Sequence, residues 1–353
     1  MWRDGRGAGE PWPPGEDVAE PVTDQPARQA TPAATAAGTA WPAPPGASAP
    51  AALTPSANAR AEAADAVAAQ AVAAKAAYEN FPVALRLLPR RYREHLMAVY
   101  VFARTADDIG DQAPAAERLR LLAELKADVG RLYATIGEPG PAPAGGAEGP
   151  TLPAVRGLAR TVTECAIPSQ PFVDLIRANQ QDQVVTRYRT FDDLAGYCRL
   201  SANPVGRIVL HVFGCFSAAR AEQSDLICTG LQLAEHWQDV AEDLRASRIY
   251  LPLEDLAVHD CSERDLAASQ AGPVVRELMA FEVGRARSLI DAGAPLVGTL
   301  RGAARAAVAG YVAGGRAALA AIAAADHDVL AATPRPGRLR TAAELVTAFT
   351  RGR

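Results

Sequence analysis

Residues 231–252 read LQLAEHWQDVAEDLRASRIYLP, and the spacing of polar and apolar side chains in this stretch decides the fold class. Side chains three or four positions apart lie on the same side of an α-helix. The stretch has one apolar face and one polar face, and the polar face carries Gln232, Glu235, Asp239 and Asp243. It is therefore predicted to be a helix that packs through one face and presents carboxylates from the other.

A second acidic cluster closes the mainly apolar segment HLMAVYVFARTADDIGD, at residues 95–111. Its carboxylates belong to Asp107, Asp108 and Asp111, of which the first and last are four positions apart on one helical face. A solvated acidic surface would explain either cluster taken alone. Two clusters that both end apolar helices indicate more, because like charges brought together repel and lose solvation unless cations neutralise them.

Mg²⁺ is the cation that suits such clusters. It prefers oxygen ligands, keeps some of its waters, and commonly links one or two protein carboxylates to the phosphate oxygens of a substrate. Two acidic helices that face each other therefore predict a binding site for a diphosphate and its cations.

Two arginines lie next to the acidic clusters. Arg104 precedes the first cluster by one helical turn, where a guanidinium could contact diphosphate oxygens. It could equally pair with Asp108 along its own helix. Arg248 and Tyr250 follow the second cluster in the string RIYLP, and Arg248 could either reach over a bound diphosphate or serve as an ordinary helix-terminal arginine.

The segment SANPVGR, at residues 201–207, interrupts a helical pattern at Asn203 and Pro204. A proline inside a helix kinks it and frees backbone carbonyls, which can stabilise positive charge in an apolar pocket. A simple break between two helices is the alternative.

The chain of 353 residues is predicted to form one large helical domain. Residues 1–56 are rich in Pro, Ala and Gly without helical or strand periodicity, and they are predicted to be a disordered tail. The helical domain is expected at 57–330, and a C-terminal segment that can be partly helical at 331–353. The expected helices cover roughly residues 60–78, 93–111, 114–136, 152–165, 171–187, 192–214, 217–246, 272–292, 295–305 and 307–330.

Composition argues against several classes of function. With 36 basic and 40 acidic residues the formal net charge is −4, so no nucleic-acid partner is expected. The five cysteines lack a CxxC pattern and the five histidines lack an HExxH pattern, which argues against a zinc enzyme. Neither a secretory signal nor a transmembrane helix is expected, so the protein is predicted to be cytoplasmic, and a peripheral membrane contact through an apolar surface stays open.

Residues 78–325 resemble the squalene and phytoene synthase family. The resemblance rests on ENFPVALRLLP at 79–89, RTADDIGD at 104–111, TRYRTFDDL at 186–194, YCRLSANPVGR at 197–207, and the two acidic clusters with the RIYLP exit. Within the family these strings are most similar to the bacterial hydroxysqualene synthases. The resemblance implies an all-α, class I isoprenoid synthase fold, in which antiparallel helices surround a central cavity.

The same resemblance implies a reaction and its cofactors. Presqualene diphosphate ionises with the help of more than one Mg²⁺ ion, its cation rearranges, and water captures it as hydroxysqualene, without a nicotinamide. Other enzymes of squalene synthesis are further partners that the resemblance implies. The implied metal ligands are Asp107, Asp108, Asp111, Glu235, Asp239 and Asp243, although relatives usually carry Asn at the position of Glu235. The implied diphosphate-binding residues are Arg104, Arg248, Tyr250 and Gln232, and the catalytic residues are Tyr197, Asn203, Asp107 and Asp239.

Tyr197 and Asn203 are the candidates to hold the attacking water, although a buried tyrosine is more often an ordinary core residue. Two other functions stay open. A condensing synthase that joins two prenyl diphosphates would use the same motifs, and a non-catalytic helical scaffold would not need them. Release of diphosphate that depends on Mg²⁺ separates an enzyme from a scaffold.

Overall fold

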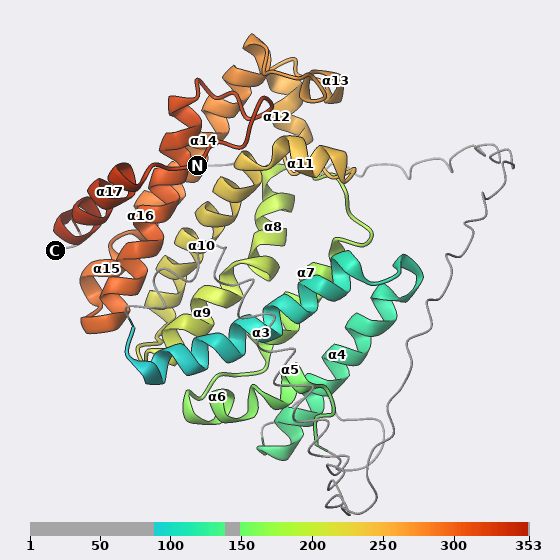
Figure 1. Ribbon diagram of the computed structural model, residues 1–353, viewed down its shortest axis with the longest axis vertical. Helices are drawn as coiled ribbons and strands as arrows, with labels where there is room; N and C mark the ends of the chain where they lie inside the picture. The colour runs from blue at the N-terminus through green and yellow to red at the C-terminus, as the bar shows by residue number, and fades with distance from the viewer. Residues whose placement is uncertain (1–87, 138–148, 352–353) are drawn as a thin grey trace, which may run out of the picture. The chain divides into compact units, whose positions relative to one another are not determined.

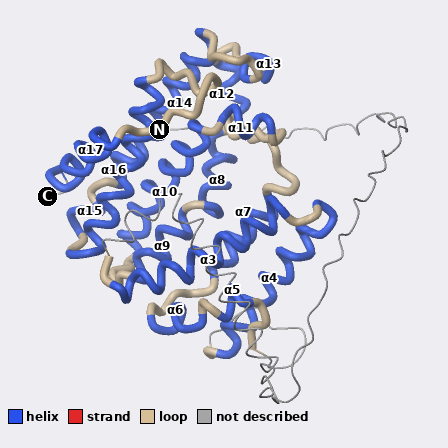
Figure 2. Tube along the Cα trace, viewed as in Figure 1, coloured by secondary structure: helices blue, strands red, loops and turns tan. Residues whose placement is uncertain are grey.

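The computed structural model describes residues 88–137 and 149–351, which form a set of packed α-helices (Figure 1). Among these residues no strand occurs, and an isolated parallel bridge between Arg187 and Ile249 is the single β-type pairing (Figure 2). The expected all-α fold is therefore confirmed. The tail expected at 1–56 and the helix expected at 60–78 lie outside the described residues.

The helices follow one another through short connections. In chain order they are α3 (Arg90–Gln112), α4 (Ala115–Thr135), α5 (Pro153–Arg156), α6 (Ala159–Glu164), α7 (Gln170–Gln181), α8 (Phe191–Ser201), α9 (Asn203–Val212), α10 (Ala218–Gln238), α11 (Val240–Arg245), α12 (Leu253–Val258), α13 (Glu263–Leu266), α14 (Pro273–Gly293), α15 (Leu296–Thr299), α16 (Gly302–Ala324) and α17 (Arg338–Arg351). The last of these lies in the segment expected at 331–353.

Several helices expected from the sequence are wrong in extent. The helix expected at 152–165 divides into α5 and α6, and those expected at 295–305 and 307–330 correspond to the short α15 and to α16, which begins at Gly302 and ends at Ala324. The helix expected at 217–246 divides at Asp239, which ends α10 and precedes α11. The helix expected at 192–214 divides into α8 and α9, because Pro204 occupies the first turn of the second. The helix expected at 171–187 ends at Gln181, since the following residues pair with the chain after α11.

Two hydrophobic clusters form the core. One is built mainly around α8, α10, α14 and α16, with the fully buried Trp237 among its members. The other is built mainly around α3, α4, α7 and α9, where the ring of Phe102 meets that of Phe172 edge to face with centroids 5.1 Å apart. Burial of each large side chain contributes about 1.5–3 kcal/mol, so these clusters fix the helices that carry the acidic residues.

Helices α10 and α14 approach each other closely because glycines lie at their contact. A Cβ atom added to Gly230 would lie 2.6 Å from Cγ1 of Ile290, and one added to Gly293 would lie 2.5 Å from the carbonyl oxygen of Gln223. Any larger residue would force the helices apart. The close contact holds α10, which carries the second acidic cluster, against a long neighbouring helix.

Helix α16 is long and apolar enough to cross a membrane by length and composition alone, whereas the sequence predicts no such helix. In the structure it packs against α10, α14 and α17. Its most apolar window is 56% buried in the protein. That packing is the packing of a core helix in a bundle.

Candidate active site

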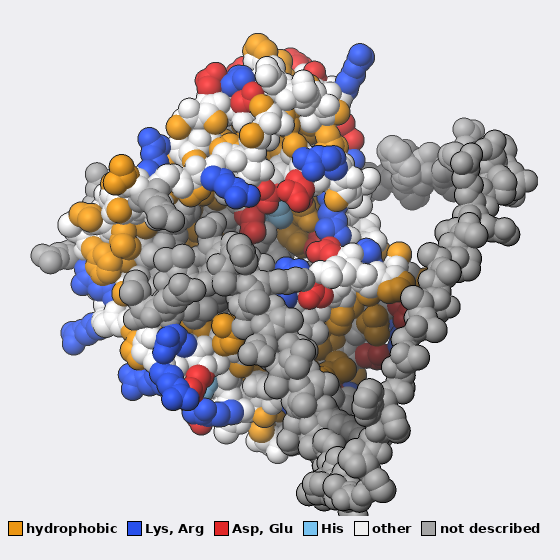
Figure 3. Space-filling model, in the orientation of Figure 1, with side chains coloured by type: hydrophobic (Ala, Val, Ile, Leu, Met, Phe, Trp, Pro, Cys, Tyr) orange, Lys and Arg blue, Asp and Glu red, His pale blue; other side chains and the backbone are white. Residues whose placement is uncertain are grey.

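A cavity of about 310 Å³ opens where the two hydrophobic clusters meet. Helices α3, α7, α8, α10 and α11 and the segment after α11 all contribute side chains to it. In Figure 3, acidic side chains gather around a hollow in the middle of the face shown, next to α11. The residues that line it are Asp107, Asp111, Leu175, Ala178, Asn179, Asp182, Tyr197, Ser201, Gln232, Glu235, His236, Asp239, Asp243, Arg248 and Tyr250.

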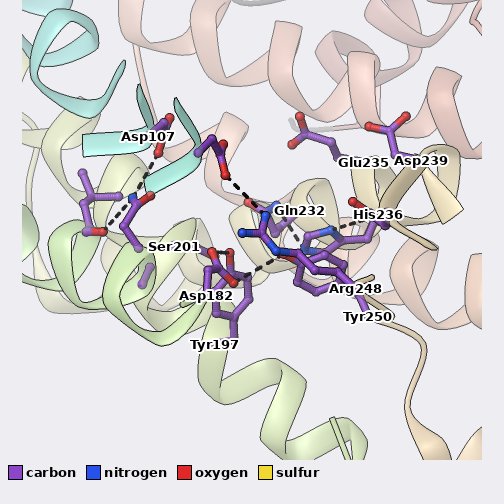
Figure 4. A pocket seen from close by; sticks show the side chains of 15 residues that line it. Asp107, Asp182, Tyr197, Ser201, Gln232, Glu235, His236, Asp239, Arg248 and Tyr250 are labelled. Carbon is purple, nitrogen blue, oxygen red and sulfur yellow. Dashed lines mark hydrogen bonds and ion pairs between the residues drawn. The ribbon is translucent and has the colours of Figure 1, made fainter. Parts of the chain in front are cut away.

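The carboxylates of the two acidic clusters line opposite sides of this cavity. Asp107 and Asp111 come from α3, whereas Glu235, Asp239 and Asp243 come from α10, α11 and the joint between them. Figure 4 shows Asp107 on one side of the cavity and Glu235 and Asp239 on the other. The structure thus brings together five of the six carboxylates that the sequence singles out as metal ligands.

Burial makes these carboxylates costly to ionise. It raises the pKa of Asp107 and of Asp239 above the ordinary aspartate range. Burial, together with the charge of Asp239, raises the pKa of Asp243 to about 7. Cations that enter the cavity would therefore stabilise the ionised form of these carboxylates.

The arrangement suits Mg²⁺ only together with a substrate. Among the described residues, no three acidic or His/Cys side chains converge closely enough to hold a metal ion by themselves. Mg²⁺ usually binds one or two carboxylates and completes its shell with waters and substrate phosphates. The donors here are all hard carboxylate oxygens on two facing walls, so they fit ions that a diphosphate bridges.

Arg248 supplies positive charge between the walls. Its Nη1 lies 3.4 Å from Oδ1 of Asp111, and its side chain is 22% exposed. Its position follows from the end of α11: Ser247 adopts a left-handed φ of 61°, and the amide of Arg248 donates to the carbonyl of Asp243 at 2.9 Å. This is the hydrogen-bond pattern of a Schellman motif, which ends α11 at Arg245, three residues before Arg248.

The chain after α11 is fixed against the segment between α7 and α8. The amide of Ile249 donates to the carbonyl of Thr186 at 3.0 Å, and the amide of Leu253 donates to the carbonyl of Tyr188 at 2.9 Å. Arg187 donates to the carbonyl of Ser247 at 2.8 Å and to the carboxylate of Glu263 through two bonds. These bonds hold Arg248 and Tyr250 in place relative to the loop that follows α7.

A carboxylate and two phenols form one side of the cavity. The Tyr197 hydroxyl donates to Oδ2 of Asp182 at 2.7 Å, and the Tyr250 hydroxyl lies 3.4 Å from Oδ1 of the same residue. Burial raises the pKa of Asp182 to about 6, even though the Tyr197 hydrogen bond and the charge of Arg248 lower it. Burial and the charge of Asp182 also raise the pKa of Tyr197, which therefore keeps its proton.

His236 forms the adjoining wall. Its ring stacks on that of Tyr250, with centroids 3.7 Å apart and planes 14° from parallel. The amide NH₂ of Gln232 lies 3.2 Å from Nε2 of His236, so this nitrogen accepts and the ring proton is assigned to Nδ1. Burial lowers the pKa of His236 to about 3, so the ring is neutral near pH 7.

Three residues singled out by the sequence are not brought into the cavity. Asp108 pairs with Arg104 at 2.8 Å along α3, and neither residue lines the cavity. Asn203 is buried at the start of α9, where its Oδ1 accepts from the Thr229 hydroxyl at 3.0 Å. The expected roles of Asp108 as a metal ligand, of Arg104 at the diphosphate and of Asn203 at the water are thus not supported by position.

The cavity also contains residues that the sequence reasoning left out as site residues. Asn179 donates from Nδ2 to Oδ1 of Asp107 at 3.1 Å and so orients that carboxylate. Ser201 lies one turn after Tyr197 on α8, and its spacing of four could have revealed it. Asp182 and His236 line the cavity too, and helical spacing could have revealed them: His236 follows Gln232 by four positions, and Asp182 follows Asn179 by three.

The sequence profile of the squalene/phytoene synthase family matches residues 74–342. A hydroxysqualene synthase from Rhodopseudomonas palustris is 34% identical over 226 residues, which are 63% of this chain and 72% of that protein. A phytoene synthase from Arthrospira platensis is 31% identical over 223 residues, which are 59% of this chain and 68% of that protein.

A solved structure shows the same fold. The crystal structure of squalene synthase HpnC from Alicyclobacillus acidocaldarius superimposes with a TM-score of 0.66 at 38% sequence identity. The match covers 75% of this chain and 95% of that protein. Fold and sequence profile therefore agree.

Proposed function

Because this chain belongs to the squalene/phytoene synthase family, we propose that it converts presqualene diphosphate and water into hydroxysqualene and diphosphate. The observation that carries the proposal is the composition of the cavity. Facing carboxylates and Arg248 line it together with the part-buried Asp182–Tyr197 pair, whose hydroxyl and carboxylate can hydrogen-bond a water. Similarity to hydroxysqualene synthases supports the same reaction.

The first step breaks the carbon–oxygen bond to diphosphate. Mg²⁺ held between Asp107 and Asp111 on one wall and Glu235, Asp239 and Asp243 on the other would neutralise charge that develops on the leaving group. Among the described residues that line the cavity, Arg248 is the arginine, and its guanidinium can bind diphosphate oxygens. Gln232 and Tyr250 add polar hydrogens on the same side of the cavity.

The second step is the fate of the carbocation. Leu175 and Ala178 supply the aliphatic part of a cavity lining that is otherwise mostly polar, and a cation beside them would be shielded from water on that side. Tyr197 also lines the cavity, and an aromatic ring there can stabilise positive charge. Capture by one retained water gives the alcohol, and loss of a proton instead gives a hydrocarbon.

A condensing synthase that joins two prenyl diphosphates is the second candidate, and the similarity to phytoene synthases favours it. It would use the same carboxylate walls. The two functions differ in their substrate, because a condensing enzyme consumes two molecules of a simple prenyl diphosphate.

Product analysis separates the two candidates. The protein is supplied with Mg²⁺ and either presqualene diphosphate or farnesyl diphosphate, without a nicotinamide and in ¹⁸O-labelled water. The proposed function predicts a labelled alcohol from presqualene diphosphate. Absence of that alcohol together with efficient condensation of farnesyl diphosphate would establish the second candidate instead.

A further inference from the structure

The cavity contains a buried hydroxyl that lacks a protein partner in the part of the chain that the structure describes. This is Oγ of Ser201, a residue that lines the cavity. Buried hydroxyls are almost always hydrogen-bonded to protein or to an ordered water, so an exception requires an explanation. Ser201 follows Tyr197 by one turn of α8, which brings the two side chains onto the same face of the helix.

Ser201, Tyr197 and Asp182 lie together on one side of the cavity, below Asp107 in the close view (Figure 4). The Tyr197 hydroxyl already donates to Asp182 at 2.7 Å, so its oxygen has lone pairs to offer a second donor. A water between Ser201 and Tyr197 would satisfy the free hydroxyl of Ser201. It would also donate a hydrogen bond to the hydroxyl oxygen of Tyr197, which in turn donates to Asp182.

We propose that Ser201 positions the water that captures the carbocation, and that Asp182 accepts the proton of this water through the hydroxyl of Tyr197. This inference rests on the proposed function, because a condensing synthase has no such water. It assigns Tyr197 and Asp182 to catalysis and Ser201 to positioning.

The step is balanced in atoms and charge. A lone pair of the water oxygen forms the new carbon–oxygen bond to the allylic cation, which gives a protonated alcohol. That alcohol gives a proton to the Tyr197 oxygen as the Tyr197 hydroxyl proton passes to Oδ2 of Asp182. The products are a neutral alcohol, an unchanged phenol and a neutral carboxylic acid, which returns its proton to solvent when the product leaves.

Asp182 differs from the other carboxylates of the cavity in its neighbours. The groups that face it are the hydroxyls of Tyr197 and Tyr250, the guanidinium of Arg248 and the more distant charge of Asp111. It belongs to neither acidic cluster. Burial raises the pKa of Asp182 to about 6, so near neutral pH it is mostly ionised and yet holds a proton more firmly than an ordinary aspartate does.

Other polar groups near the cavity are less suited to this step. The Nε2 lone pair of His236 already accepts from Gln232. The amide of Asn203 is not basic, and its oxygen accepts from Thr229 away from the cavity. Asp182 is therefore the acceptor that the hydrogen-bond pattern indicates.

The experiment measures two quantities for each variant with presqualene diphosphate and Mg²⁺: the rate of diphosphate release and the share of alcohol among the products. In Asp182→Asn the release rate should stay within about threefold of the wild type, whereas the alcohol share falls by about tenfold or more. In Ser201→Ala the alcohol share should fall about fivefold, the size expected for the loss of one hydrogen bond. Hydrocarbons formed by proton loss should replace the alcohol.

Controls separate chemistry from folding. Asp182→Glu keeps a carboxylate and should recover much of the alcohol share that Asp182→Asn loses. Asp174→Asn, at a carboxylate of α7 that does not line the cavity, and Ser288→Ala, on α14, replace the same residue types away from this cavity and should change neither quantity. If Asp182→Asn does not fold, Tyr197→Phe tests the same relay, because it breaks the link and leaves the carboxylate in place.

The outcomes are distinct. An unchanged alcohol share in the folded Asp182 and Ser201 variants would overturn the inference and leave the proposed function intact. A parallel loss of diphosphate release and alcohol in Asp182→Asn would also overturn it, because Asp182 would then act on ionisation. If the wild-type protein makes no alcohol from presqualene diphosphate, the proposed function fails and this inference fails with it.

Discussion

Arg248 and Asp111 join the two walls of the cavity: Nη1 of the arginine lies 3.4 Å from Oδ1 of the aspartate, which is 137 residues earlier in the chain. A diphosphate between the walls would offer Arg248 two or more oxygens in place of one carboxylate. A cation near Asp111 would compete with Arg248 for the same carboxylate. Binding of substrate is therefore expected to replace this ion pair.

The first prediction concerns Arg248. Arg248→Gln removes the guanidinium and should weaken the binding of inorganic diphosphate in the presence of Mg²⁺ by about tenfold or more, since a charged hydrogen bond contributes about 1.5–3 kcal/mol. Isothermal titration calorimetry measures the dissociation constant. Arg245→Gln is the matched control, because Arg245 is exposed on α11 and does not line the cavity. Equal effects of the two changes would refute the role of Arg248.

The second prediction compares the carboxylates of the acidic clusters that line the cavity with Asp108, which does not line it. Asp107→Asn and Asp239→Asn should each lower kcat by at least about a thousandfold, because each removes a carboxylate that faces the site of charge development. Asp108→Asn should have little effect, since Asp108 pairs with Arg104 outside the cavity. Steady-state diphosphate release measures all three. A large loss in Asp108→Asn with normal turnover in Asp107→Asn would reverse the assignment.

The third prediction concerns pH. Burial and Asp239 raise the pKa of Asp243 to about 7, and burial raises that of Asp182 to about 6, against about 3.9 in an unfolded chain. The folded state therefore binds protons more strongly than the unfolded state. This contribution to stability is complete below about pH 4 and is lost as pH rises through about 6 to 7.

The metal-free protein should accordingly show a larger decrease in Tm between pH 5.5 and pH 8 than Asp243→Asn, measured by calorimetry. Mg²⁺ with diphosphate should raise Tm most at pH 8, where the carboxylates are ionised. Glu222→Gln, an exposed carboxylate on α10, is the control and should keep the pH dependence of the wild type. The same pH dependence in Asp243→Asn as in the wild type would contradict the assignment to Asp243.

The fourth prediction concerns Asn203. Because Oδ1 of Asn203 accepts from the buried Thr229 hydroxyl, Asn203→Leu should destabilise the fold by about 1–3 kcal/mol and leave the alcohol share unchanged. Denaturant unfolding and product analysis measure the two effects. Thr229→Val should destabilise to a similar extent, and the double variant should cost less than the sum. A changed alcohol share in the folded Asn203 variant would restore the role expected from the sequence.

Periodicity accounts for what the sequence could predict. The helical spacing of carboxylates identifies Asp107 and Asp111 on one element and Asp239 and Asp243 on another, and both pairs line the cavity. The separation of Asp108 from this group also follows from helix geometry, because it lies about 100° around the helix from Asp107. Asp108 instead forms an ion pair with Arg104 along the same helix.

The remaining features depend on contacts between distant parts of the chain. Asp182 follows the end of α7, and its meeting with Tyr197 requires both the end of α7 and the orientation of α8. The proline after Asn203 predicts a break, yet nothing local shows that the asparagine faces Thr229 on α10. No proline or glycine marks the point at Asp239 where the second acidic helix divides, and the helical spacing of polar and apolar side chains continues across it.

The bonds that join the loop after α7 to the chain after α11 also bear on how the protein folds. They connect residues 60 apart in sequence, as in the bond from Arg187 to the carbonyl of Ser247. Such contacts form only after the chain between them has lost much of its conformational freedom, whereas each helix can begin to form locally. The active site should therefore be among the last regions to assemble, and the backbone amides of Ile249 and Leu253 should gain protection from hydrogen exchange after those of α10 and α14.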